Sequence, residues 1–483
     1  MSDRLIQSIP ADLYIGGEWR PSSDGQRFDV RDPATEEVIA AVASASAEDA
    51  TAAVTAAYEA GKEWAARPPM ERADILWNSY ELMVERSEEY ATVMSREEGK
   101  TFAEGMGEAN YAAGFLRWFA EEAVRSTGRF GRAPAGINNI LVQHRPVGVS
   151  LLITPWNFPA AMATRKIAPA LAAGCTTILK PASESPLTAL MMMELFEQAG
   201  VPAGVVNTLP SRRASVISNT ILSDTRTRKL SFTGSTEVGR LLLSKAAEQV
   251  INCSMELGGN APFIVLDDAD LEVSVEAALV AKMRNAGESC IGANRFHVHS
   301  SLIEEFASRF SEEMSRLKVG PGLAEGVDVG PLVNAETIDK VEELVDGAVA
   351  RGARVLTGGK RIDRLGFFYE PTVMLDIPED CEILHTEIFG PVAPIVPFDD
   401  VDEVVEKAND TEFGLAAYVC GQNVGRALAV AERLEAGVMG INRGFISDPA
   451  APFGGFKQSG LGREGSREGL HEFLETKYIA VEW

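Results

Sequence analysis

Apolar residues repeat at helical spacing through the first third of the chain, after a short extended segment. Ser46 has the features of an N-cap, and Asp49 follows three residues later at the start of an apolar pattern over residues 50–64. Two further helical patterns cover residues 70–97 and 102–124. The spacing therefore predicts a mainly helical beginning to the chain.

The pattern changes near residue 140, where short β-branched apolar runs replace the helical spacing. The predicted strands cover residues 140–145, 147–153, 176–179, 205–209, 229–232, 252–255, 263–266, 295–298 and 478–481. Helical patterns lie between several of them, over residues 186–199, over residues 236–248 and up to about Arg284. Strands that alternate with helices indicate an α/β fold with parallel, doubly wound sheets.

Composition and charge narrow the classes of partner. The 483 residues are 46% hydrophobic and 24% charged, which is ordinary for a globular protein, and the formal net charge is -25. A polyanion repels nucleic acid and anionic membranes, so neither is expected as a partner. The first ten residues lack a signal-peptide pattern and the apolar runs are too short to span a bilayer, so we expect a cytoplasmic protein.

The five cysteines are scattered and form no CxxC pair, so neither a disulfide framework nor a metal site is expected. Cys175 and Cys420 adjoin predicted strands, where cysteine behaves as a small apolar residue. Cys381 stands between two acidic residues that disfavour a thiolate. Cys290 lies in a turn of small residues, 285–292, which can expose the thiol and offer N–H groups to an anion. From position alone, an inert cysteine is still the commoner case.

Three loops at predicted strand ends carry further candidates. Residues 232–239 join a strand to a helix and contain two glycines, which suits a phosphate but equally an ordinary turn. Glu256 precedes two glycines and has the chemistry of a general base. Asn157 has an amide that can stabilise an oxyanion. Each of these residues alone is more often structural.

Together these segments resemble the aldehyde dehydrogenase superfamily over nearly the whole chain. The motifs, in family order, are residues 154–159, 179–181, 232–239, 255–259, 287–290, 387–392 and 452–460. The resemblance implies Cys290 as the nucleophile, Glu256 as the general base and Asn157 as the oxyanion donor. The cofactor contacts that it implies are Thr154, Pro155, Trp156, Lys180, Ser183, Gly234, Ser235, Glu387 and Phe389.

The implied reaction is the NAD(P)-dependent oxidation of an aldehyde to a carboxylate through a thioester on Cys290. Asn157 and the Cys290 backbone N–H would hold the oxyanion, and Glu256 would activate the water that hydrolyses the thioester. Relatives that transfer the acyl group to coenzyme A typically lack this glutamate, which favours hydrolysis here. A coenzyme A-acylating enzyme and a crystallin-like structural protein remain as alternatives.

Within the superfamily, the closest likeness is to succinate-semialdehyde dehydrogenases, over residues 163–166, 282–285 and 440–447. The resemblance implies that Arg165, Arg284 and Ser447 hold the far carboxylate of the substrate, since arginine pairs with carboxylates through charge-assisted hydrogen bonds. Glutarate semialdehyde, 2-oxoglutarate semialdehyde and a broad range of aldehydes remain as alternative substrates. Structural ion pairs remain as an alternative role for both arginines.

One departure from the family pattern stands two residues before the nucleophile, where the commonest motif has glutamine and this chain has Glu288. The change is either neutral or raises the thiol pKa through a nearby charge, and the sequence leaves both open. Some relatives carry a second cysteine two residues after the nucleophile. This chain has Gly292 there, so no regulatory disulfide is expected.

The cofactor is expected to be NADP in preference to NAD, with NAD still possible. Family members selective for NAD often have glutamate three residues after the strand-end lysine, where this chain has Ser183 after Lys180. Glu184 is expected to point elsewhere if the strand end stays extended. Arg212 and Arg213 are expected near the adenosine end, where they favour a 2′-phosphate, with a solvated basic turn as the alternative.

The resemblance also divides the chain into three parts. Residues 1–123 and 147–256 would form a Rossmann-type dinucleotide-binding domain, and residues 257–455 an α/β catalytic domain. A β oligomerisation arm would consist of residues 124–146 and 469–483, with a hairpin paired to the terminal strand. Such arms extend a neighbouring subunit's sheet, so a homodimer or homotetramer is expected.

Overall fold

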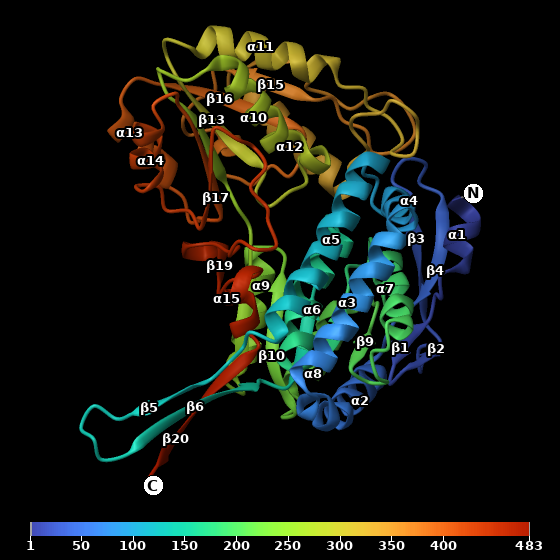
Figure 1. The fold of residues 1–483 in the computed structure, drawn as a ribbon. Helices are drawn as coiled ribbons and strands as arrows, with labels where there is room; N and C mark the ends of the chain where they lie inside the picture. The colour runs from blue at the N-terminus through green and yellow to red at the C-terminus, as the bar shows by residue number, and fades with distance from the viewer. Residues whose placement is uncertain (1, 483) are drawn as a thin grey trace.

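Helix α2 (Ala47–Ala66) begins with the capping box that the sequence predicts. The Ser46 hydroxyl accepts hydrogen bonds from the backbone N–H groups of Glu48 and Asp49, and the Asp49 carboxylate accepts one from the Ser46 N–H at 2.9 Å. The computed structural model describes residues 2–482 (Figure 1). Met1 and Trp483, the outer ends of two predicted domain ranges, lie outside the described residues.

The first sheet has eight strands in the order β19-β11-β10-β7-β8-β9-β1-β2. Its five central strands are parallel, and the three others, at the two ends of this order, pair antiparallel. The strands are β1 (Leu13–Ile15), β2 (Glu18–Arg20), β7 (Val149–Ile153), β8 (Thr176–Lys180), β9 (Val206–Thr208), β10 (Thr227–Thr233), β11 (Asn252–Glu256) and β19 (Gly460–Leu461).

Helices cover both faces of this sheet because its apolar side chains point alternately to either side. Leu152 belongs to a core with one set of helices, and Leu151 to a core with α2, α8 and α9. The helices are α1 (Ser2–Ser8), α3 (Pro69–Glu85), α4 (Ser87–Glu97), α5 (Phe102–Ala123), α6 (Pro159–Ala173), α7 (Pro186–Gln198), α8 (Ala214–Ser223), α9 (Thr236–Ala247) and α15 (Ser466–His471).

Two details of these helices differ from the sequence prediction. The pattern over residues 70–97 is two helices, because the chain turns at Arg86, whose backbone N–H caps α3. Helix α8 was not predicted, and no side chain caps its N-terminus, so the usual N-cap signal is missing.

The second sheet has seven strands in the order β14-β15-β16-β13-β12-β17-β18, all parallel except for the pairing of β14. The strands are β12 (Ala261–Val265), β13 (Ala293–His299), β14 (Arg354–Thr357), β15 (Thr372–Leu375), β16 (Val392–Phe398), β17 (Ala416–Cys420) and β18 (Val438–Ile441). The helices are α10 (Leu271–Met283), α11 (Ile303–Arg316), α12 (Ala335–Ala350), α13 (Val401–Asn409) and α14 (Val424–Ala431), and the short 3₁₀ turns are η1 (Arg284–Gly287), η2 (Glu382–Leu384) and η3 (Lys457–Ser459). Helices again pack on both faces, which confirms the predicted α/β class.

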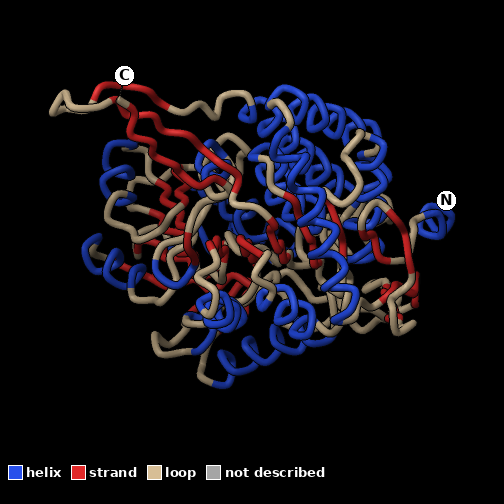
Figure 2. The backbone as a smooth tube through the Cα atoms, turned by 90° about the horizontal axis from the view of Figure 1, so that it is seen from below, coloured by secondary structure: helices blue, strands red, loops and turns tan. Residues whose placement is uncertain are grey.

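A three-stranded arm of order β20-β6-β5 extends from the body of the molecule (Figures 1 and 2). It consists of the hairpin β5 (Arg129–Arg132) and β6 (Asn139–Pro146), with β20 (Leu474–Val481) paired antiparallel to β6. The pairing of hairpin and terminal strand is as predicted. A separate two-stranded sheet joins β3 (Arg27–Arg31) to β4 (Val38–Ala43). No helix among residues 2–482 is long and apolar enough to cross a membrane.

Candidate active site

A cavity of about 380 Å³ lies where the loops after β7, β10 and β11 meet the loop that carries Cys290. Ligands of α/β proteins typically bind at such carboxyl ends of parallel strands. Eight predicted site residues line it: Pro155, Trp156, Asn157, Gly234, Ser235, Cys290, Glu387 and Phe389. Seven do not: Thr154, Arg165, Lys180, Ser183, Glu256, Arg284 and Ser447.

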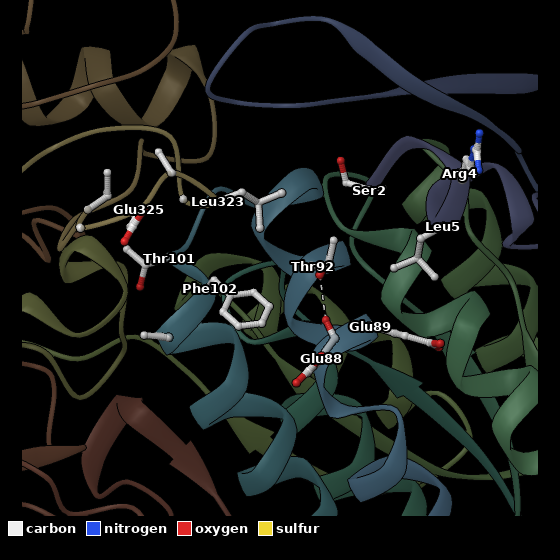
Figure 3. A pocket seen from close by; sticks show the side chains of 15 residues that line it. Ser2, Arg4, Leu5, Glu88, Glu89, Thr92, Thr101, Phe102, Leu323 and Glu325 are labelled. Carbon is white, nitrogen blue, oxygen red and sulfur yellow. Dashed lines mark hydrogen bonds between the residues drawn. The ribbon is translucent and has the colours of Figure 1, made fainter.

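A larger hollow of about 870 Å³ lies between α1, α4, the start of α5 and the loop at residues 322–327 (Figure 3). Its apolar lining includes Leu5, Phe102 and Leu323, and none of the predicted site residues reaches it. Size alone does not make a catalytic site, and the smaller cavity holds the nucleophile candidate.

The Cys290 loop is held in an unusual backbone shape. Asn285 and Ala286 have φ angles of 54° and 53°, in the left-handed region that costs energy for residues other than glycine. Gly287 follows with φ 82°, and a Cβ there would lie 2.2 Å from the Gly390 carbonyl oxygen, so only glycine fits. The Asn285 amide secures the loop by donating to Glu98 Oε1 at 2.7 Å and to the Asn157 carbonyl at 3.0 Å.

The Cys290 thiol is partly exposed at the cavity wall. Burial raises its pKa to about 12, the Glu387 and Glu256 carboxylates act in the same direction, and Arg165 and Arg284 act against them. The free thiol is therefore protonated at neutral pH and needs a proton acceptor or a nearby positive charge to react.

Asn157 is buried and fixed from several sides. Its Nδ2 donates to the Glu288 carbonyl at 2.9 Å, and its own backbone carbonyl accepts a hydrogen bond from Lys100 Nζ at 2.8 Å. A primary amide has two N–H donors, so one remains after the bond to Glu288. Asn157 thus lines the same cavity as Cys290 and has donor capacity for a substrate oxygen.

Glu256 ends β11 as a buried carboxyl group whose two oxygens both lack a hydrogen-bond partner among the described residues. Burial raises its pKa well above the ordinary value, and the neighbouring Glu464 adds to the shift. The cations that oppose the shift are Lys166, Arg165 and Arg463. A dry carboxyl group with free lone pairs can take a proton from water, as a general base must.

The other side of the cavity suits a dinucleotide. Ser235 caps α9, a twelve-residue helix, so the positive end of that helix lies at the cavity wall. Glu387 Oε1 accepts the Gly259 N–H at 3.0 Å, and burial raises its pKa to about 7. Phe389 and Trp156 pack edge to face, with ring centroids 5.5 Å apart. Both side chains line the cavity, so they form an apolar wall for a planar ligand ring.

Comparison with known proteins agrees with this geometry. The model of the aldehyde dehydrogenase family matches residues 19–479. The chain belongs to the aldehyde dehydrogenase family. It is therefore an oxidoreductase that acts on aldehydes, and the predicted resemblance is confirmed.

Three relatives with a named substrate match along nearly the whole chain. A succinate-semialdehyde dehydrogenase of Paenarthrobacter nicotinovorans is 52% identical over 92% of this chain and 99% of its own. An NADP(+) succinate-semialdehyde dehydrogenase of Escherichia coli is 47% identical, and a glutarate-semialdehyde dehydrogenase of Pseudomonas putida 46% identical, each over 97% of both chains. Among solved structures, an NADP-dependent enzyme of E. coli has a TM-score of 0.97 at 46% identity over 98% of both chains.

In this aldehyde dehydrogenase, the three candidates for a substrate carboxylate gather around Tyr111. Arg284 Nη1 donates to Ser447 Oγ at 3.1 Å, and Arg165 Nη2 donates to the Tyr111 hydroxyl at 2.5 Å. The two guanidinium groups lie 5.7 and 5.8 Å from the centroid of the Tyr111 ring. Sequence analysis missed Tyr111, because a tyrosine inside helix α5 looks like an ordinary packing residue.

One expectation about the adenosine side is wrong, and two arginines expected there have partners elsewhere in the chain. Glu184 does not point away: it lines the cavity, and its Oε2 accepts a hydrogen bond from the Ser183 hydroxyl at 3.2 Å. Arg212 and Arg213 do not line the cavity. Arg213 pairs with Asp24 at 2.5 Å, and Arg212 donates to the Asp29 carbonyl at 3.3 Å, so the N-terminal segment engages both.

Lys340 is a second residue that sequence analysis missed. Its Nζ donates to the Glu387 carbonyl at 2.6 Å, and its side chain lines the cavity from helix α12. A lysine on a helix gives no sequence signal that separates it from a solvated one. No group of three His, Cys, Asp or Glu residues between positions 2 and 482 is arranged to hold a metal.

Proposed function

We propose that this aldehyde dehydrogenase oxidises succinate semialdehyde to succinate, through a thioester on Cys290. The observation that carries the substrate is the pair of arginines around Tyr111, with Arg284 bonded to Ser447. Two guanidinium groups among aromatic rings suit a carboxylate at the far end of a short aldehyde, and Arg165 also has Glu464 as an ion-pair partner at 3.7 Å. The relatives named for succinate semialdehyde support the same choice.

In the first half of the proposed reaction, the Cys290 sulfur transfers its proton to solvent water and bonds to the aldehyde carbon. The carbonyl oxygen becomes an oxyanion, which accepts hydrogen bonds from the second Asn157 N–H and the Cys290 backbone N–H. A nicotinamide held against cavity-wall residues such as Trp156 and Phe389 would supply the acceptor for the hydride that leaves this carbon. The carbonyl then re-forms as a thioester, so the two electrons of the C–H bond leave with the hydride.

In the second half, Glu256 takes a proton from a water molecule that attacks the thioester carbon. The Cys290 sulfur leaves as a thiolate and the carboxylate product forms. Both Glu256 oxygens are without partners in the described structure, so a proton can be accepted without breaking an existing bond. This supports hydrolysis in preference to acyl transfer to coenzyme A.

The proposed nicotinamide cofactor is NADP, with NAD as the weaker alternative. Two features support the choice: a small neutral residue at Ser183, and the NADP(+) relative from E. coli. The buried Lys180 ends β8, where its charge favours a phosphate over a hydroxyl. Glu184 opposes NADP, because it adds a negative charge to the cavity wall.

A second substrate, glutarate semialdehyde, is one methylene longer and has the same two functional groups. The relative from P. putida favours it as the next candidate. One methylene in a pocket typically changes selectivity by about 1–3 kcal/mol, so both compounds are expected to react, at different rates.

The test is a panel of four aldehydes, each assayed with NADP and with NAD: succinate semialdehyde, glutarate semialdehyde, butanal and betaine aldehyde. We expect the highest kcat/KM for succinate semialdehyde with NADP. Addition of coenzyme A should leave the rate unchanged. A higher kcat/KM for butanal than for either semialdehyde would refute the proposed substrate class.

We also propose that the chain is a homodimer or homotetramer assembled through the arm, with the boundaries given by the sequence. The arm carries exposed apolar side chains, including Tyr478 at 58% and Ile137 at 76% exposure, which a partner would cover. The domain roles proposed from the sequence are unchanged: residues 1–123 and 147–256 for the cofactor, and 257–455 for catalysis.

A further inference from the structure

Five charged side chains gather beneath the Cys290 loop, and only one of them is a cation. They are Glu98, Lys100, Glu104, Glu108 and Glu288. All are buried except Glu104, which is half-buried. One ammonium cannot balance three buried carboxylates and a half-buried one, and an unpaired buried charge is costly. At least one of these carboxyl groups should therefore carry a proton.

The carboxyl groups differ in how many hydrogen-bond donors they receive. Glu108 accepts three donors: Lys100 Nζ at 2.6 Å and the backbone N–H groups of Ala160 and Ala161 at the start of α6. Its oxygens are therefore occupied as acceptors by three donors. The one cation of the cluster thus makes its short contact with Glu108.

Glu104 and Glu98 are also well supplied with donors. Glu104 accepts the Asn285 N–H at 2.6 Å and both the N–H and the hydroxyl of Thr101. Glu98 accepts the Asn285 side-chain amide at 2.7 Å and the Lys100 N–H at 3.1 Å. Both carboxylates therefore support the loop from below as acceptors.

Glu288 differs from the other three. Among the described residues, one hydrogen bond reaches its side chain: the Val333 N–H donates to its Oε1 at 3.0 Å. Its side chain is buried, with the whole residue 1% exposed, and the groups that face it are Glu98, Glu104 and Lys100. With one donor and two carboxylates nearby, Glu288 is the group that accepts the proton most readily.

We infer that Glu288 is a positioning residue that works as a neutral carboxylic acid and holds the nucleophile loop in place as long as it keeps its proton. Its backbone carbonyl accepts the Asn157 amide at 2.9 Å, and its side chain binds the segment before α12. Ionisation would place a charge beside Glu98, push the loop away and disturb Asn157. In its protonated form Glu288 is uncharged and accepts the Val333 N–H, as the glutamine that the family commonly has at this position also could.

The inference has a signature in stability that does not depend on activity. Burial and the Glu98 charge raise the Glu288 pKa well above that of a glutamate in an unfolded chain. When the pH exceeds the pKa that Glu288 has in the unfolded chain, Glu288 ionises in the unfolded chain and lowers its free energy. In the folded chain Glu288 stays protonated, so the folded state does not gain this free energy. The wild type should therefore lose stability relative to Glu288→Gln as pH rises, until the folded-state pKa is reached.

The first experiment compares melting temperatures of the wild type and Glu288→Gln from about pH 5 to about pH 9. We expect the advantage of the variant to grow across this range by roughly 2 °C or more. Glu325→Gln, at an exposed glutamate, is the matched control and should show a constant difference. A constant difference for Glu288→Gln as well would overturn the inference, because Glu288 would then be ionised throughout.

The second experiment measures turnover and rests on the proposed role of Cys290. At neutral pH, Glu288→Gln should keep kcat within about twofold, since glutamine retains the acceptor for Val333, while Glu288→Ala should lose roughly tenfold. An inactive but folded Glu288→Gln variant would show that the charge itself is needed and overturn the inference. If Glu288→Gln does not fold, Glu98→Gln is the second variant, and its loss of activity at alkaline pH should be smaller than in the wild type, because Glu98 no longer repels the ionised Glu288. If activity falls with rising pH in Glu98→Gln in the same way as in the wild type, the inference is also overturned.

The melting experiment needs no substrate, so failure of the proposed function would leave its result intact.

Discussion

Arg284 Nη1 donates a hydrogen bond to Ser447 Oγ at 3.1 Å, so the end of α10 and a loop far along the chain meet at one point. The Arg284 guanidinium also lies over the rings of Phe158 and Phe445, at 4.7 and 4.9 Å from their centroids. Aromatic rings on several sides keep the charge in a fixed place while leaving N–H donors for a ligand.

Replacement of Arg284 by alanine should raise KM for succinate semialdehyde and spare butanal. Loss of a charge-assisted hydrogen bond typically costs about 1.5–3 kcal/mol, which is roughly 10- to 100-fold in kcat/KM. Arg165→Ala should act in the same direction. Exposed Arg443, four residues before Ser447, supplies the control Arg443→Ala, which should change neither substrate. Equal losses for both aldehydes would assign a structural role to Arg284.

Replacement of Cys290 by alanine should abolish oxidation and leave cofactor binding nearly intact. The thiol lies at the wall of the cavity, so its removal deletes one atom there without a large change in packing. Quenching of tryptophan fluorescence by NADP would measure binding separately from turnover. Cys253→Ala, at the other partly exposed cysteine, is the control and should stay active. Normal turnover in Cys290→Ala would remove Cys290 from the mechanism.

Replacement of Glu256 by glutamine should slow hydrolysis of the thioester and leave its formation largely intact. A stopped-flow trace should then show one burst of reduced cofactor per active site, followed by slow turnover. The substitution preserves the shape of a side chain whose oxygens have no partners, so misfolding is not expected. Absence of a burst together with loss of hydride transfer would mean that Glu256 acts earlier.

The cofactor preference should respond to residue 183. The wild type is expected to have a higher kcat/KM with NADP than with NAD, and Ser183→Glu should reverse the order because a carboxylate repels a 2′-phosphate. Glu184→Gln tests the other acidic position, since Glu184 lines the cavity. Removal of its negative charge should increase the preference for NADP. A wild type that strongly prefers NAD would show that Glu184 already performs this exclusion.

Light scattering at micromolar concentration should give the mass of a dimer or a tetramer. Removal of residues 474–483 deletes β20, leaves β6 without its partner strand and should weaken the assembly. A monomeric wild type would contradict the proposed role of the arm.

Local chemistry explains which parts of this structure could be predicted from the sequence. The family resemblance implied the pairing of β6 with β20, whereas the Ser46 cap and the apolar strands follow from spacing and short-range signals. The direction of Glu184 and the partners of Arg213 do not, because they depend on loops that meet only after folding. Tyr111 could not be predicted as a site residue for the same reason, because it is brought next to Arg165 and Arg284 only when the chain folds.

The order of synthesis gives the arm a further consequence. Strand β6 lies in the first third of the chain, yet its partner β20 occupies residues 474–481, which are synthesised long after it. The Cys175 thiol and the Val147 N–H likewise bond to the carbonyl of Phe473. The arm cannot close until β20 has been synthesised. The proposed assembly through the arm therefore has to wait for the end of β20, and a stop codon before residue 474 should yield a chain whose arm lacks one strand.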